Sequence, residues 1–195
     1  MSTTPSTALV VLTGPLTQAQ IERAVPAWAE VRATTTVDTT AAAALAQVAP
    51  GAEVIVVLGT WCGDSKREVP RLWRALEVAG TVPFAVTYLG VDRAKEAPNG
   101  VVDGLDARYV PTIIVRRDGA EVGRIIEGAT DGVEVALLAL LRGQRSGVLS
   151  LRGFALRAAG LCGSGEMSVA FAVCAVRGGW LRCARRPRAP RARGA

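Results

Sequence analysis

One cysteine in this chain stands where thiol chemistry would be favoured. Cys62 lies in the stretch GTWCGDSKREVPRL (59–72), which is predicted to end a strand, turn tightly and begin a helix. Free backbone N–H groups and the helix dipole favour a thiolate at such a helix N-terminus. Ser65, three residues further on, is predicted to donate its hydroxyl to that thiolate and so to assist it. The carboxylate of Asp64 opposes the negative charge.

A single thiolate can attack a disulfide, but it cannot complete the exchange alone. Its attack forms a mixed disulfide. Release of the bound partner then requires another thiol, and the position three residues after Cys62 holds a serine. The predicted reaction is therefore monothiol exchange with protein thiols or disulfides, regenerated by glutathione or another small external thiol. The alternative is that Cys62 is an inert, half-buried residue in a turn, as free cysteines often are.

Composition narrows the chemistry further. The 195 residues include no histidine, which removes the usual base of a Cys–His nucleophile and the commonest metal ligand. The charged residues Asp64, Lys66 and Glu68 are interpreted as a solvated helix face rather than as a metal or acid–base cluster. No metal and no cofactor are therefore expected.

Hydrophobic patterning predicts alternating strands and helices. The strongest strand signal is the continuously apolar EVIVVLG at 53–59, typical of a strand buried on both faces. Pro26 is expected to break or kink the first helix, Asp131 to cap the last one, and Asp118-Gly119 to close a tight hairpin. Strands are predicted at 8–12, 34–39, 53–59 and 83–91, helices at 15–33, 41–49, 65–78 and 131–143, and the hairpin at 112–128.

Four features occur in the order and spacing of one known family. They are WCGDS (61–65), Pro70 eight residues after Cys62, YVPT (109–112) and RDGAEVGRIIEG (117–128). Between residues 52 and 143 the chain resembles the thioredoxin family. The resemblance implies an α/β fold, a thioredoxin-like three-layer α/β/α sandwich with a mixed central sheet.

The same resemblance implies where a substrate would bind. Pro111 would be a cis-proline that faces the reactive cysteine, and it would leave the Val110 backbone free to pair with an extended peptide. Cys62 and Ser65 would be the catalytic residues. The residues implied in substrate binding are Trp61, Gly63, Val110, Pro111 and Gly128.

The chain departs from the family at groups that handle protons and electrons. Cys-Gly-Asp-Ser replaces the family's dithiol. Val56 stands where the family often carries a buried acid, and Tyr88 stands in place of a frequent strand lysine. Two functions therefore remain open: a monothiol oxidoreductase, and a non-catalytic module that keeps the peptide groove. The loop DRAKEAPNG (92–100) is interpreted as solvated and is given no function.

The basic charge of the chain belongs to its C-terminal part. Residues 144–195 contain ten arginines and one acid, a balance of +9, whereas residues 1–143 carry a balance of −3. We therefore predict a thioredoxin-like domain at 1–143 and a poorly ordered Arg-rich tail at 144–195. Nucleic acid would bind only through this tail, as a third candidate function. The tail also holds three of the four cysteines, an alternative source of a second thiol.

The N-terminal sequence suggests a location. Its apolar run at 8–12 is five residues long, too short for a signal peptide or a membrane span. We therefore expect a cytoplasmic protein that makes no membrane contact.

Overall fold

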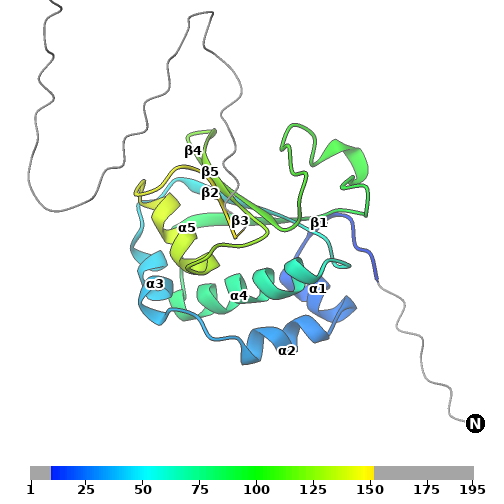
Figure 1. Cartoon of the computed structure of the whole chain (residues 1–195), viewed down its shortest axis with the longest axis horizontal. Coiled ribbons are helices and arrows are strands. Elements are labelled where there is room, and N and C mark those ends of the chain that lie inside the picture. The colour runs from blue at the N-terminus through cyan, green and yellow to red at the C-terminus, as the bar shows by residue number, and fades with distance from the viewer. Residues whose placement is uncertain (1–9, 152–195) are drawn as a thin grey trace, which may run out of the picture. The chain divides into compact units, whose positions relative to one another are not determined.

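A computed structural model of the chain describes residues 10–151. Within them, a six-stranded mixed sheet combines with five α-helices (Figure 1). The strands are β1 (Gly14–Leu16), β2 (Ala52–Leu58), β3 (Phe84–Gly90), β4 (Thr112–Arg117), β5 (Ala120–Ile126) and β6 (Gly147–Ser150). The helices are α1 (Gln18–Ala24), α2 (Ala27–Thr34), α3 (Thr39–Ala44), α4 (Gly63–Ala79) and α5 (Val133–Leu141), with 3-10 turns η1 (Leu45–Gln47) and η2 (Pro98–Gly100).

The sheet has the order β1-β3-β2-β4-β5-β6. β2 runs parallel to β3, with Val56 opposite Tyr88, and antiparallel to β4, with Val56 opposite Ile113. β1 pairs antiparallel with β3, β5 antiparallel with β4, and β6 parallel with β5. Because β2 lies in the middle of the sheet, the turn that follows it, with Cys62, leaves from the centre of one sheet end.

The middle of the chain folds as its patterning predicts. β2, α4 and β3 each begin and end within two residues of the predicted bounds. The break at Pro26 is confirmed, since α1 ends before it and α2 starts after it. Asp118 and Gly119 both have positive φ, 52° and 77°, as a tight hairpin turn between β4 and β5 requires.

The helices pack together on one face of the sheet (Figure 1). A single core of buried side chains joins Trp28 of α2, Leu72 of α4 and Leu137 of α5 to Val54 and Val56 of β2. Burial of these large apolar side chains is the main stabilising contribution to this layer.

The opposite face of the sheet is covered by a loop. Val57 of β2 packs there against Leu105, which comes from the segment 91–111. That segment forms no α-helix, only η2. Positive φ interrupts helical structure, and it occurs here at Lys95, Asn99, Gly100, Gly104 and Asp106. The second helical layer of the expected sandwich is therefore absent from residues 10–151.

The strand predicted at 8–12 is wrong for the described residues 10–12, which form no strand. Thr60 holds this segment instead. Its Oγ1 donates a hydrogen bond to the carbonyl of Val10 at 2.5 Å and accepts one from the N–H of Leu12 at 3.1 Å. The N-terminal segment is thereby fastened to the turn that follows β2.

The strand predicted at 34–39 is also wrong, because that segment ends α2 and begins α3. Asp38 explains the difference. Its carboxylate accepts hydrogen bonds from the N–H groups of Thr40 and Ala41, both at 2.9 Å, and so caps a helix where the β-branched residues suggested a strand.

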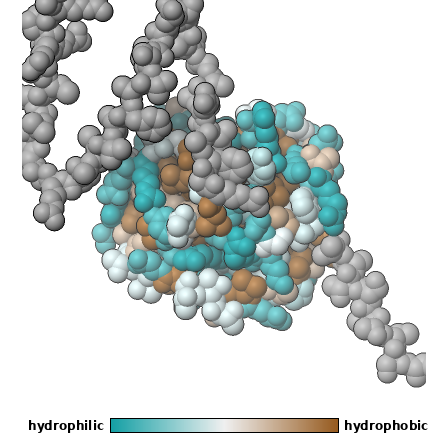
Figure 2. Space-filling view, in the orientation of Figure 1, coloured by the Kyte–Doolittle hydropathy of each residue, from teal (hydrophilic) through white to brown (hydrophobic). Residues whose placement is uncertain are grey.

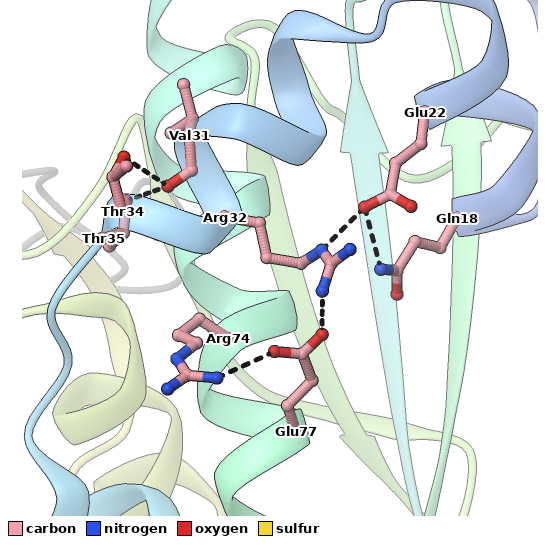
Figure 3. Close-up of polar contacts among 8 residues, drawn as sticks. All are labelled: Gln18, Glu22, Val31, Arg32, Thr34, Thr35, Arg74 and Glu77. Carbon is pink, nitrogen blue, oxygen red and sulfur yellow. Dashed lines mark hydrogen bonds and ion pairs between the residues drawn. The ribbon is translucent and has the colours of Figure 1, made fainter.

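Polar side chains connect the outer helices (Figure 3). Arg32 of α2 donates to Glu22 of α1 at 2.7 Å and also pairs with Glu77 of α4, which in turn accepts from Arg74 at 3.2 Å. All four side chains are partly exposed, so each pair contributes little stability by itself. The network helps to orient α2 relative to α4, but it is not the main source of the stability of the fold.

A buried ion pair joins α4 to α5. Glu134 is fully buried, and it accepts hydrogen bonds from Nε and Nη2 of Arg71, both at 2.8 Å, and from the N–H of Asp38 at 2.9 Å. Burial by itself raises the pKa of the Glu134 carboxyl, but the bonds from Arg71 and Asp38 outweigh it, and the pKa lies below its ordinary value. The carboxylate therefore stays charged inside the protein.

The sheet continues beyond the predicted domain end at residue 143. β6 follows α5 and pairs with β5, Gly123 lying opposite Gly147. Asp131 does not cap α5 as predicted. Its carboxylate pairs with Arg145 at 2.8 Å, and the N-cap is Gly132. The remainder of the predicted tail, with Cys162, Cys174 and Cys183, lies outside the described residues.

Among residues 10–151, no helix has the length and apolar character needed to cross a bilayer. The face shown in Figure 2 has hydrophilic and hydrophobic residues interspersed over it.

Candidate functional site

Cys62 occupies the N-cap position of α4, and its side chain makes no capping hydrogen bond. The thiol is half-buried. Its Sγ donates to the carbonyl oxygen of Val110 at 3.2 Å, across 48 residues of sequence. The start of α4 and the loop before β4 therefore meet at the sulfur.

The Val110-Pro111 peptide bond is cis, as predicted. Three hydrogen bonds hold this segment in place. Cys62 bonds to the Val110 carbonyl, the N–H of Glu127 donates to the Pro111 carbonyl at 2.8 Å, and Thr112 Oγ1 donates to the Tyr109 carbonyl at 2.6 Å. No acceptor for the Val110 N–H lies among residues 10–151, so this donor is unused there.

Trp61 forms one wall beside the thiol. Its indole N–H donates to the carbonyl of Val91, at the end of β3, at 3.0 Å. A Cβ at Gly59 would lie 2.7 Å from the indole ring, so the ring is packed directly on the backbone of the turn. These contacts hold the ring on the turn that precedes Cys62, and its part in substrate binding stays a prediction.

Ser65 has a hydrogen-bond partner in the backbone of the turn. It is fully buried, and its Oγ accepts a hydrogen bond from the N–H of Gly59 at 3.2 Å. No hydrogen bond between Ser65 and Cys62 occurs in the described part of the chain. Ser65 was predicted to donate a hydrogen bond to the Cys62 thiolate. In this structure its Oγ instead closes the turn between β2 and α4.

The charges on the first turns of α4 largely neutralise one another. Arg67 pairs with Asp64 at 2.8 Å and with Glu68, also at 2.8 Å. The hydrogen bond that Arg67 donates to Glu68 raises the pKa of the Arg67 guanidinium. The carboxylate that was expected to oppose a thiolate, Asp64, is therefore engaged with a cation. Gly63, next to the thiol, is exposed, and a Cβ there would meet no atom within 4 Å.

Gly128 lies on the far side of Pro111, one residue after the Glu127 that bonds to it. A Cβ at Gly128 would lie 2.8 Å from Cδ1 of Leu151 and 3.1 Å from the carboxylate of Glu68. Its φ of +141° also favours glycine. The predicted groove residue is therefore enclosed by two side chains, and one of them, Leu151, is 44% exposed directly after β6.

Val56 and Tyr88, two of the three departures from the thioredoxin-family pattern, belong to the core on the face of the sheet that the helices cover. Val56 is completely buried. Tyr88 packs edge-on against Trp73, with ring centroids 6.1 Å apart, and burial raises its pKa to about 12. Neither residue supplies a proton carrier at neutral pH.

The structure adds three residues that the sequence did not single out. Tyr109, directly before Val110, is 44% exposed. Glu127 reaches the site through its backbone N–H. The guanidinium of Arg93 lies over the Trp61 ring, 5.3 Å from the ring centroid. Tyr109 was visible in the sequence as the aromatic residue of YVPT, whereas no local pattern connects Arg93 to Trp61.

Metal binding finds no support in residues 10–151, where no three His, Cys, Asp or Glu side chains are grouped closely enough to hold an ion. Comparison with known proteins adds no function. No protein-family profile and no curated protein sequence matches the chain. Among solved structures, it is similar to a crystal structure of a protein of unknown function from Pseudomonas aeruginosa, with 19% sequence identity, a TM-score of 0.40, and coverage of 66% of this chain and 78% of that one.

Proposed function

We propose that this chain is a thioredoxin-like oxidoreductase that uses Cys62 as its single nucleophile. One observation carries the proposal: the half-buried Sγ of Cys62 lies at the start of α4 and 3.2 Å from the carbonyl oxygen of Val110, the residue before a cis-proline. The thioredoxin-like character is proposed for the arrangement of β2, α4 and the β4–β5 hairpin.

The first step is attack on a protein disulfide. Cys62 loses its proton to solvent, and its thiolate attacks one sulfur of the substrate. The substrate S–S bond breaks, a new S–S bond joins the substrate to Cys62, and the leaving thiolate takes a proton from water. The unused N–H of Val110 is available to bond to an extended substrate backbone next to the reacting sulfur.

The second step uses an external thiol. Cys62 is the single cysteine of residues 10–151, and Ser65 stands three residues after it. A small thiolate such as that of glutathione attacks the Cys62 sulfur of the mixed disulfide or the substrate sulfur bonded to it. Attack on the Cys62 sulfur forms a disulfide between the small thiol and Cys62 and releases the reduced substrate. A second glutathione then restores the Cys62 thiol.

A non-catalytic peptide-binding module is the second candidate function. The hydrogen bonding of Ser65 favours it, since its Oγ accepts from the Gly59 N–H and no hydrogen bond joins it to Cys62 within residues 10–151. In such a module Trp61, Val110 and Pro111 bind a peptide without turnover.

Turnover with a peptide disulfide separates the two functions. Wild-type protein and Cys62→Ser are mixed with an oxidised peptide, with and without glutathione, and free peptide thiol is measured over time. The proposal predicts multiple turnovers that need both glutathione and Cys62. Peptide binding by both proteins, with no thiol release above the glutathione background, would support the binding module.

A further inference from the structure

Arg93 lies over the ring of Trp61, the chain neighbour of Cys62, and forms no ion pair within residues 10–151. We infer that it selects substrate segments carrying an acidic side chain beside the attacked disulfide. This inference rests on the proposed function, because it assigns the substrate class of the same site.

One contact places the Arg93 side chain, and a second contact holds the ring on which it lies. Its guanidinium carbon lies 5.3 Å from the centroid of the Trp61 ring, and that ring is itself held by its hydrogen bond to the Val91 carbonyl at 3.0 Å. Trp61 is the direct neighbour of Cys62 in the chain. A cation stacked on this indole is therefore presented at the wall of the thiol site.

The backbone around Arg93 is also fixed. Asp92 accepts hydrogen bonds at its Oδ1 from the N–H groups of Ala94 and Glu96, at 2.8 and 2.9 Å, and its own N–H donates to the carbonyl of Glu96 at 3.0 Å. Arg93 thus projects from a compact turn directly after β3. The backbone of this turn therefore loses little further entropy when Arg93, whose side chain is exposed, binds a ligand.

The guanidinium has no carboxylate partner among residues 10–151, although Glu96 lies on the same turn. Two other arginines already have carboxylate partners. Arg67 pairs with Asp64 and Glu68, and Arg108 pairs with Asp106 at 2.8 Å. The guanidinium carbon lies over the ring face, and the Arg93 N–H groups donate to no other group within residues 10–151. Those donors match the two oxygens of a carboxylate.

The acidic side chain would belong to the client polypeptide. As the substrate sulfur approaches Cys62 past Trp61, a carboxylate one or two residues from that sulfur reaches the guanidinium edge. The attraction is electrostatic and lies at an exposed position, so it favours acidic over neutral clients by a modest factor that decreases with added salt.

Two matched peptides test this inference. Each carries one cysteine activated as a 2-pyridyl disulfide, flanked on both sides by Asp in the first peptide and by Asn in the second. Attack by Cys62 on the peptide sulfur forms the peptide–Cys62 disulfide and releases 2-thiopyridone, whose absorbance gives the rate. The ratio of the two rates is compared for wild type, Arg93→Gln, Arg93→Lys and Lys95→Gln, in full-length protein at low and high salt. Lys95→Gln removes an equal charge from the same turn without touching Trp61.

We expect the Asp-to-Asn rate ratio to be about two- to five-fold higher in wild type than in Arg93→Gln at low salt. Lys95→Gln should keep the wild-type ratio, and Arg93→Lys should give an intermediate one because it keeps the charge without the planar donors. The inference is overturned if Arg93→Gln keeps the wild-type ratio, or if Lys95→Gln lowers it equally. Release of 2-thiopyridone from neither peptide would instead overturn the proposed function, and this inference with it.

Discussion

The sulfur of Cys62 and the carbonyl oxygen of Val110 are 3.2 Å apart, although 48 residues separate them in the sequence. This contact ties the N-terminus of α4 to the loop that enters β4. The Cys62 thiol donates this hydrogen bond, so its partner in the structure is a backbone carbonyl rather than a second cysteine.

This contact predicts different effects for two substitutions of Cys62. In Cys62→Ser the hydroxyl still donates to the Val110 carbonyl, so the free energy of unfolding should change by no more than about 0.5 kcal/mol. In Cys62→Ala that carbonyl, on a residue only 5% exposed, loses its donor at a cost of about 1 kcal/mol or more. Urea denaturation measures both values. Equal stability of the two variants would mean that the hydrogen bond contributes nothing.

The ion pair between buried Glu134 and Arg71, whose side chain is 32% exposed, predicts a loss of stability in Glu134→Gln. The substitution removes the counter-charge of a partly exposed guanidinium and weakens its hydrogen bonds, which costs about 1.5–3 kcal/mol. Glu22→Gln is the matched control, since Glu22 pairs with Arg32 at a partly exposed position, and it should cost less than about 1 kcal/mol. Similar values for both variants would show that the burial of Glu134 adds nothing to the pair.

The same pair predicts a pH dependence. Because the pKa of Glu134 is lower in the folded chain, its contribution to stability is complete above the unfolded pKa of about 4.3 and is lost as the pH falls through the lower folded value. The stability difference between wild type and Glu134→Gln should therefore be constant near neutral pH and shrink in acid. Denaturation curves from pH 7 to pH 3 test this. A difference that stays constant down to pH 3, or grows, would contradict it.

Gly132 has no side chain, and this makes room for the paired side chains of Arg71 and Glu134. A Cβ at this position would lie 2.6 Å from Nη2 of Arg71, and the φ of +97° adds strain for any other residue. Gly132→Ala should therefore destabilise the protein more than Gly51→Ala, where φ is +90° but no atom lies within 4 Å. We expect a further loss of about 1 kcal/mol or more in the free energy of unfolding. Equal losses would show that Arg71 moves aside freely.

The hydrogen bonds of Arg124 predict that this residue holds the loop that covers the sheet face opposite the helices. Its Nη1 donates to the carbonyls of Leu105 and Asp106, at 3.0 and 3.1 Å, while Glu121 orients the guanidinium. Arg124→Met should accelerate amide hydrogen exchange in the segment 101–110 several-fold, since the loop loses its connection to β5. Arg108→Met, which breaks only an exposed pair with Asp106, should leave this exchange nearly unchanged. Unchanged exchange in both variants would show that Arg124 does not hold the loop.

Patterning predicted those parts of the fold in which local preference and burial agree. The continuous apolar run of β2 is stable only in the middle of a sheet, where both of its faces are covered. β2 ends at Leu58, and Cys62 is the N-cap of α4. Asp118 and Gly119 accept positive φ, which fixed the hairpin. The approach of Val110 and Pro111 to Cys62 was implied by the resemblance of YVPT (109–112) to the thioredoxin family, not by local patterning.

The remaining features depend on contacts that no local pattern contains. Asp38 begins a helix partly because its N–H bonds to Glu134, 96 residues later. The β6 strand exists through its pairing with β5, although its four residues give little strand signal by themselves. Ser65 was placed correctly at the turn, but its partner, the Gly59 N–H, depends on how tightly the turn closes. Arg93 reaches Trp61 only through the path of the loop after β3.

The reactivity of Cys62 tests the central claim most directly. Folded protein and a short peptide with the sequence TWCGDS are treated with limiting iodoacetamide at pH 7, and peptide mapping by mass spectrometry follows Cys62 separately from the other three cysteines. A functional nucleophile predicts faster alkylation of Cys62 in the folded protein than in the peptide. Alkylation slower than in the peptide, with no mixed disulfide formed by an oxidised substrate, would show that this cysteine is inert.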